Sequence, residues 1–173
     1  MLSDTMLNAL NDQITREFQS AYLYMGMAAH FEAENLSGFA KWMRLQAQEE
    51  SCHALILYNY VCDRGGRVAL GAMEAPLSVF GSVKEVFEKT LAHERYITES
   101  IDGLMALAIK ESDNATRVML QWFVTEQVEE EANVTHILAR LEMVKGSKNG
   151  IFMMNRNLGA RAFSVPTPLS GKL

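Results

Sequence analysis

Four segments of similar length carry the apolar periodicity of an α-helix, and together they occupy most of the 173 residues. Each follows a residue suited to capping a helix, after which apolar side chains recur every three or four positions. The predicted helices cover residues 5–33, 38–64, 83–112 and 115–145, after caps at Asp4, Ser37, Ser82 and Asn114. At ~1.5 Å per residue they would be about 40 to 46 Å long. Helices of matched length predict an all-α bundle.

The connections between these segments predict the directions of the helices. Residues 34–37 and 113–114 are short, so each flanking pair of helices should pack antiparallel. Residues 65–81 form a glycine-rich stretch much longer than the usual loop of ~4 to 6 residues. Extended at ~3.3 Å per residue, this stretch would reach about 55 Å. We therefore expect a crossover along the whole bundle, with the second and third helices parallel.

The chain changes character after the four-helix bundle, which we assign to residues 1–145. Residues 146–160 contain an apolar stretch at 151–158, which predicts a short fifth helix. The tail at 161–173 contains two prolines and is expected to be disordered. A chain of this length needs one hydrophobic core only, so we expect a single domain.

Composition narrows the possible functions. The formal net charge of −5 argues against a nucleic-acid surface, which requires clustered lysine and arginine. The longest apolar run, residues 21–29, is too short to cross a bilayer, and no signal peptide opens the sequence, so a cytoplasmic protein without membrane contact is expected. Cys52 and Cys62 lie too far apart on one predicted helix to bridge, and their spacing does not indicate a zinc or rubredoxin-type site.

Polar residues interrupt the apolar stripe of every predicted helix near its middle. They are Glu17 in the first helix, Glu50 and His53 in the second, Glu94 in the third, and Gln127 and Glu130 in the fourth. The spacing of Glu50 and His53 places both side chains on one helix face. With the second and third helices parallel, Glu50 and Glu94 lie at the same height along the bundle. The antiparallel pairs place Glu17 beside Glu50, and Glu130 beside Glu94. We therefore expect these side chains to converge in one buried layer.

Four buried carboxylates need protons, solvent or cations to balance their charge. Two divalent metal ions would neutralise them, and oxygen ligands with one imidazole suit Fe(II) or Mn(II). Bridging by Glu50 would hold two ions close enough to react jointly with O₂. A lone Glu17 or His53 is more often a satisfied core residue than a ligand, but the whole layer favours a di-iron redox centre. Tyr24 could hydrogen-bond the site or donate an electron, and packing explains it about as well.

The same residues carry a resemblance to a known family. Glu17, the Gln-Glu-Glu-Ser-Cys-His stretch at 48–53, Glu94 and residues 121–131 resemble bacterial non-haem ferritin, over roughly residues 1–160. Ferritin-like proteins are helix bundles with an internal di-iron carboxylate site. The resemblance implies a ferritin-like four-helix bundle with a long crossover between helices two and three, plus a short C-terminal fifth helix.

The resemblance also implies a set of ligands. Glu17, Glu50 and His53 would bind one iron, and Glu50, Glu94 and Glu130 the second, with Gln127 beside it. A third, weaker iron position would use three further carboxylates and share Glu130. These are Glu49, Glu126 and Glu129, which a solvated acidic helix face explains equally well from sequence alone.

Two departures argue against a haem-binding relative. A bacterioferritin-type site would have a second Glu-x-x-His, where this chain has Gln127-x-x-Glu130, and the haem-binding methionine is replaced by Cys52. We therefore expect no haem. A rubrerythrin would need a cysteine-rich domain that 2 cysteines cannot supply, and the fifth segment distinguishes the chain from mini-ferritins.

The implied function is iron storage and detoxification. Fe(II) would be oxidised by O₂ or H₂O₂ and stored as ferric mineral in a cage of twenty-four identical subunits. The alternatives are a di-iron oxidase or peroxidase acting on a substrate other than iron, and a purely structural helix bundle. The first would need a substrate pocket, and the second predicts weak metal binding without oxygen chemistry.

Overall fold

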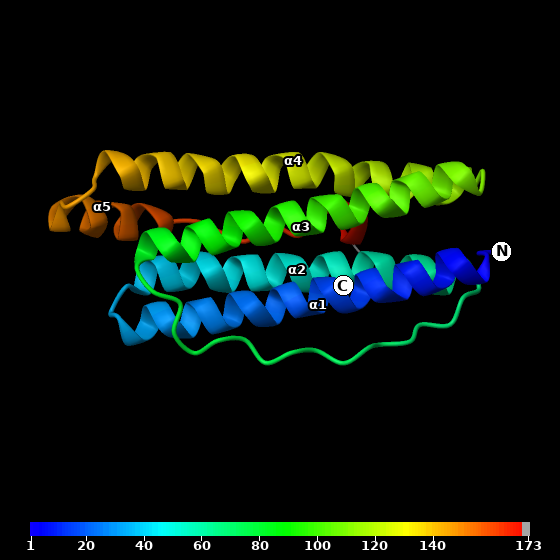
Figure 1. The fold of residues 1–173 in the computed structure, drawn as a ribbon, viewed down its shortest axis with the longest axis horizontal. Helices are drawn as coiled ribbons and strands as arrows, with labels where there is room; N and C mark the ends of the chain where they lie inside the picture. The colour runs from blue at the N-terminus through cyan, green and yellow to red at the C-terminus, as the bar shows by residue number, and fades with distance from the viewer. Residues whose placement is uncertain (171–173) are drawn as a thin grey trace.

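A computed structural model describes residues 1–170 of the chain, and within them it contains helices and no strand. The elements are α1 (Asp4–Ala33), α2 (Ser37–Asp63), α3 (Val83–Lys110), α4 (Asn114–Met143), α5 (Lys148–Leu158) and the short 3₁₀ helix η1 (Thr167–Leu169). The first four lie side by side as a bundle, and α5 lies at one end of it (Figure 1). The predicted four-helix bundle with a fifth helix is confirmed.

The helices begin where a polar side chain caps them. Ser3 accepts a hydrogen bond from the Met6 amide, and Ser82 and Glu85 form a capping box at the start of α3. Asp113 caps α4 through the Thr116 amide. The cap predicted at Ser82 is confirmed, whereas the predicted caps Asp4, Ser37 and Asn114 are themselves the first residues of their helices.

The residue before α2 is Leu36, whose apolar side chain cannot cap the helix. Asn155 of α5 supplies the cap instead. Its side-chain oxygen accepts hydrogen bonds from the amides of Gly38 and Phe39 at 2.9 and 3.0 Å. The start of α2 and the position of α5 are therefore fixed by the same side chain.

The crossover between α2 and α3 runs along α1 for the length of the bundle, so that α2 and α3 point the same way (Figure 1). Three polar side chains of α1, spaced four residues apart, form hydrogen bonds with the backbone of this crossover. Asn11 bonds both Arg67 and Ala69, Thr15 accepts from the Gly71 amide, and Gln19 both donates to and accepts from Glu74. This ladder is why a long loop without regular structure is held against one helix.

The core divides into two apolar clusters on either side of the polar layer. Phe31, Phe39 and Phe87 belong to the cluster near the α1–α2 turn. Leu10, Ile14, Leu57 and Phe123 belong to the cluster near the other end. The layer between them is thus shielded from solvent at both ends of the bundle.

The apolar stripe read from the sequence was wrong at one position of α1. Helical spacing through Ala21, Met25 and Ala28 predicts that Met25 faces the core, but Met25 is 48% exposed, and Tyr24 is fully buried instead. Cys52 and Cys62 are free thiols, as predicted. None of the helices within residues 1–170 is long and apolar enough to cross a membrane.

The segment after α5 differs from the expected disordered tail. From Gly159 it turns back along the bundle (Figure 1), and η1 packs on α2 with Leu169 only 1% exposed. Phe163 also packs against the core. Residues 171–173 of the expected tail lie outside the described residues. The prediction failed because these contacts are made to residues about a hundred positions earlier, which local composition does not reveal.

Candidate metal centre

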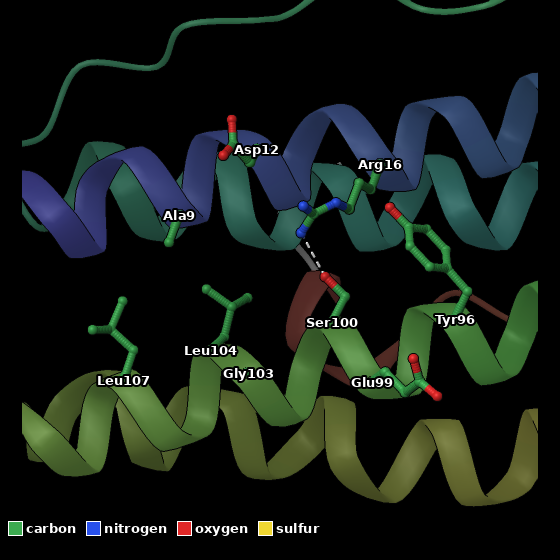
Figure 2. Close-up of a pocket in the computed structure, with 9 residues that line it drawn as sticks. All are labelled: Ala9, Asp12, Arg16, Tyr96, Glu99, Ser100, Gly103, Leu104 and Leu107. Atoms are coloured by element: carbon green, nitrogen blue, oxygen red, sulfur yellow. Dashed lines mark hydrogen bonds between the residues drawn. The ribbon is translucent and has the colours of Figure 1, made fainter.

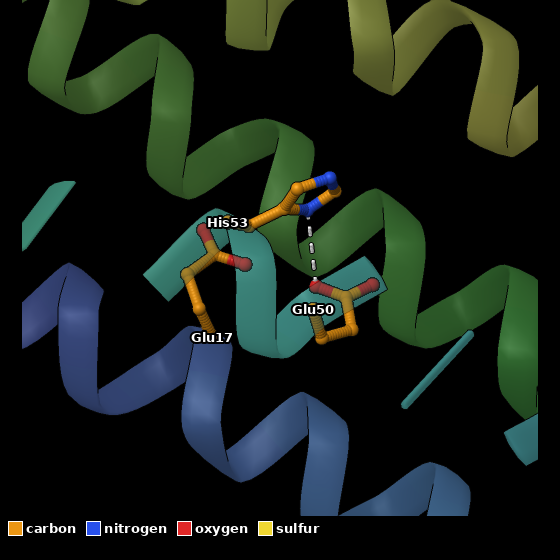
Figure 3. A group of neighbouring side chains, drawn as sticks. All are labelled: Glu17, Glu50 and His53. Carbon is orange, nitrogen blue, oxygen red and sulfur yellow. Dashed lines mark ion pairs between the residues drawn. The ribbon is translucent and has the colours of Figure 1, made fainter. Parts of the chain in front are cut away.

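Glu17, Glu50 and His53 form a buried cluster in the middle of the bundle. Glu17 projects from α1, and Glu50 and His53 project from one face of α2 (Figure 3). Each offers one ligand atom, and these atoms lie within 4.8 Å of one another. The imidazole Nδ1 of His53 lies 3.3 Å from a Glu50 oxygen. Two carboxylates and an imidazole this close, each at most 2% exposed, have the spacing of ligands around one metal ion.

Two atoms of this cluster lack a hydrogen-bond partner among the described residues. They are Oε2 of Glu17 and Nε2 of His53. The other Glu17 oxygen accepts a bond of 2.8 Å from Gln13, one turn earlier on α1. Because an unsatisfied buried carboxylate oxygen is costly, a cation is the partner that suits the free Glu17 oxygen best.

Glu94 and Glu130 complete the layer from α3 and α4. Both are buried, at 1% and 4% exposure. Glu94 accepts a hydrogen bond from the Tyr24 hydroxyl, and the Gln127 amide lies 3.4 Å from its other oxygen. Glu130 accepts a bond of 2.8 Å from Gln46 of α2. The predicted convergence of polar residues from all four helices is thus observed, with Gln127 beside Glu94.

Burial raises the pKa of every carboxyl group at which a shift is resolved in this layer. The pKa of Glu50 is raised well above its ordinary value by burial and then by the charges of Glu94, Glu17 and Glu130. Burial raises the pKa of Glu94 to about 7, and burial with the Glu94 charge raises that of Glu130 to about 7. Without a cation, the layer therefore keeps protons at neutral pH that a metal ion would displace.

Tyr24 is fully buried, and its hydroxyl group points to the layer. Burial, followed by the charges of Glu94 and Glu50, raises its pKa well above the ordinary value. It stands edge-on to His93, whose pKa is lowered to about 4 by burial and whose Nε2 lies 2.7 Å from the Ser20 hydroxyl. Tyr24 is thus a protonated phenol that donates to Glu94.

The three carboxylates expected at a third position lie beside the layer on α2 and α4. Glu49 is partly buried, Glu126 is half-buried and Glu129 is exposed. The pKa of Glu126 is raised chiefly by burial, is lowered by His53, and is raised again by Glu129 and Glu49. These carboxylates are therefore close enough for their charges to interact, and the charge of Glu49 also raises the pKa of Glu130.

Several polar residues around the layer escaped the sequence analysis. Gln13 lies four residues before Glu17, and Gln46 four residues before Glu50, so each supports a carboxylate on its own or a facing helix. Helical spacing from a candidate ligand is a signal that could have identified both. Arg161, which contacts Gln46 and Glu49, had no such signal because it falls in the segment expected to be disordered.

Hydrogen bonds link the layer to an open groove between α1 and α3. Figure 2 shows the residues that line this groove. The groove has a volume of about 350 Å³ and is bordered by Asp12 and Glu99. Arg16 donates to the Ser100 hydroxyl at 2.6 Å, and Ser100 donates to Gln13 at 2.5 Å. Since Gln13 also bonds Glu17, hydrogen bonds connect a buried carboxylate to the surface.

Comparison with known proteins gives a consistent result. A family model described as a ferritin-like domain matches residues 7–144. The chain is 39% identical to the bacterial non-heme ferritin of Bacteroides fragilis over 161 residues, 93% of this chain and 100% of that protein. It is 38% identical to that of Staphylococcus aureus over 163 residues, 94% of this chain and 98% of that protein.

Solved structures agree in fold. An open-pore ferritin from the hyperthermophilic archaeon Archaeoglobus fulgidus superposes with a TM-score of 0.93 at 42% identity, covering 94% of this chain and 100% of that one. A form of the same archaeal ferritin engineered to be closed gives 0.93 at 41% identity, over 95% and 100%. The family model matches residues 7–144, and the chain is 39% identical to a relative over that relative's whole length, so this chain belongs to the ferritin-like family.

Proposed function

We propose that this protein is an iron-storage ferroxidase, which oxidises Fe(II) at the buried layer and stores the ferric product. The observation that carries the proposal is the convergence of Glu17, Glu50 and His53, with ligand atoms within 4.8 Å, in a member of the ferritin-like family. A structural bundle has no use for buried carboxylates whose charges must be neutralised.

Each ligand has a distinct role in the proposal. Glu17, Glu50 and His53 hold the first Fe(II), and Glu50, Glu94 and Glu130 hold the second, so Glu50 bridges the pair. Gln127 lies beside the second position and orients Glu94. Tyr24 donates to the same carboxylate, and this hydrogen bond keeps the Glu94 oxygens turned into the layer.

The chemistry follows from holding two ions together. Each Fe(II) gives up one electron, and O₂ takes both electrons with two protons to become H₂O₂. With H₂O₂ as oxidant, the same two electrons and two protons yield two waters. Glu94 and Glu130, with pKa values of about 7, release protons when Fe(II) binds and accept them again when ferric ions leave.

A third position next to the pair would use Glu49, Glu126 and Glu129, together with Glu130. The support for it is the mutual electrostatic influence of these groups on α2 and α4. Because Glu126 and Glu129 are less buried than the main layer, a cation there would be held more weakly.

The product would be stored in a cage of twenty-four copies of this chain. Phe152 and Met153 on α5 are 68% and 62% exposed in the single chain. A short helix with two large apolar side chains in water needs a partner, and the fifth helices of neighbouring subunits would supply it. Closed symmetry then encloses the interior in which mineral can form.

The test is a rapid-mixing experiment on metal-free protein loaded anaerobically with Fe(II), from zero to four ions per subunit, and then mixed with O₂. A fast oxidation phase that saturates at two or three ions per subunit is expected. A rate that rises with Fe(II) without saturating, as for iron oxidised in solution, would contradict the proposal.

A further inference from the structure

The segment after α5 follows α2 past the candidate metal centre. Lys41 donates to the Gly159 carbonyl at 2.8 Å, near the start of α2. Leu169 is buried in the core cluster that includes Leu57 and Leu120. Between these two anchors, Arg161 meets the middle of α2, where the polar layer lies.

Arg161 is held by three groups of α2. Its Nη2 lies 2.5 Å from Oε2 of Glu49, and its Nη1 donates to Oε1 of Gln46. The guanidinium also stacks over the Trp42 ring, with 5.2 Å between its central carbon and the ring centroid. A planar cation gripped by a carboxylate, an amide oxygen and an aromatic face is a specific contact.

Through Gln46, the contact extends to a carboxylate of the main layer. The Gln46 oxygen accepts from Arg161, so its amide nitrogen faces Glu130 and donates to it at 2.8 Å. Arg161 therefore sets the orientation of the amide that holds Glu130. It reaches the bridged pair only indirectly, through this hydrogen bond.

The surroundings of Glu49 explain why a positive charge is placed here. Glu126 and Glu130 both respond to the charge of Glu49, so negative groups crowd this side of the layer. A guanidinium stays protonated at any physiological pH. Arg161 therefore compensates the negative charge of Glu49, the carboxylate that a metal ion at the third position would bind.

We propose that Arg161 is the resident cation of the third iron position: it holds Glu49 until an incoming metal ion displaces it. This inference rests on the proposed function, because it takes Glu49, Glu126 and Glu129 as that position. A divalent ion bound by Glu49 would repel the adjacent guanidinium. Filling the third position therefore loosens the segment at 159–170, and docking of that segment weakens the third site by the same factor.

The experiment uses Zn(II), which binds carboxylates and imidazole and is not oxidised. Calorimetric titration of the metal-free, full-length protein gives the affinity of each ion per subunit. Arg161→Gln should tighten the third site by roughly tenfold, within the ordinary range of coupled binding, and leave the affinity of the first ion unchanged, because Arg161 contacts none of the first ion's proposed ligands, Glu17, Glu50 and His53. Arg161→Lys retains the charge and should keep the third affinity close to that of the unsubstituted protein. Arg140→Gln, an exposed arginine of α4, is the control for a general change of charge.

A second readout follows the segment itself. Hydrogen exchange of residues 159–170 should stay slow with two Zn(II) per subunit and speed up as the third binds. In Arg161→Gln the exchange should be fast at every loading. This readout does not depend on oxidation, so it separates the proposal from any change of rate at the main layer.

The outcomes are distinguishable. Equal or weaker third-site affinity in Arg161→Gln would overturn the role of Arg161 while leaving the two-ion site intact. A protein that binds two ions and no third, with or without Arg161, would overturn it as well. Failure to bind two ions in the layer would overturn the proposed function itself.

Discussion

Gln13 donates a hydrogen bond of 2.8 Å to one oxygen of Glu17, and the other oxygen of Glu17 has no partner among the described residues. One helical turn on α1 separates the two side chains. The amide therefore fixes the orientation of a carboxylate that lies beside Glu50 and His53 (Figure 3). Because this hydrogen bond keeps the Glu17 carboxylate from rotating, Glu17 is already oriented to bind the first metal ion.

Gln13→Leu should weaken the first metal position. The substitution keeps the side chain's bulk, removes the donor to Glu17, and releases Ser100 and Arg16 from the chain of hydrogen bonds. Loss of a group that supports a ligand costs about 10- to 100-fold in metal affinity. Anaerobic Fe(II) titration measures it. Affinity equal to that of the unsubstituted protein would show that Glu17 needs no support from Gln13.

Glu50→Ala should abolish the fast phase of Fe(II) oxidation. Because Glu50 is the proposed bridge, its loss removes a ligand from both ions, and a decrease of at least ~100-fold, about 2.7 kcal/mol of activation free energy, is expected. His53→Ala removes a ligand from one ion and should slow the reaction less. Glu88→Ala, an exposed carboxylate of α3, is the control. A fast phase that survives in Glu50→Ala would rule out the bridging role.

The metal-free protein should lose stability as the pH rises through neutrality. Glu94 and Glu130 have folded-state pKa values of about 7 against an ordinary 4.5, and burial also raises the pKa of Glu50. The folded state thus keeps protons that the unfolded chain has already lost. Their stabilising effect is full below the ordinary pKa and disappears as the pH rises through the folded-state value, at about 1.4 kcal/mol per pH unit for each proton.

Thermal unfolding of the metal-free protein between about pH 6 and pH 8 measures this effect. The unfolding temperature should fall across the range, and Zn(II) should reduce the fall because the metal replaces the protons. Glu94→Gln with Glu130→Gln should flatten the profile of the metal-free protein. A metal-free profile that rises with pH would contradict the account.

Two glycine substitutions should act in opposite directions. A Cβ at Gly38 would lie 1.7 Å from the Asn155 carbonyl oxygen, so Gly38→Ala must push α5 away from the start of α2. It should lower the unfolding temperature and break the Asn155 cap. A Cβ at Gly103, inside α3 two turns before its end, meets no atom within 4 Å. Gly103→Ala should stabilise the helix by about 0.5 to 1 kcal/mol. Equal effects would contradict the close approach of α5.

Much of the fold follows from local sequence pattern. Apolar periodicity placed the four long helices within about two residues of their observed ends, and the length of the crossover alone implied that α2 and α3 are parallel. The same logic predicts that Glu17, Glu50 and His53 lie close together, and their ligand atoms are within 4.8 Å of one another. Their role as ligands stays a prediction.

Long-range contacts account for the features that sequence pattern missed. Asn155 caps α2 by accepting from the Gly38 amide 117 positions earlier, and Arg161 bonds Glu49 across 112 positions. Neither partnership has a periodic signature, and the prolines near Arg161 suggested disorder instead. Tyr24 and Met25 are adjacent on α1, and both are large enough to fill a core position, so periodicity alone did not predict that Tyr24 is the buried one.

The central claim is that the buried layer binds two iron ions, bridged by Glu50. Anomalous diffraction at the iron edge from crystals loaded with Fe(II) in the absence of O₂ tests it most directly. The account predicts two peaks, one coordinated by Glu17, Glu50 and His53 and the other by Glu50, Glu94 and Glu130. Iron bound elsewhere at saturating Fe(II), with no peak in this layer, would contradict it.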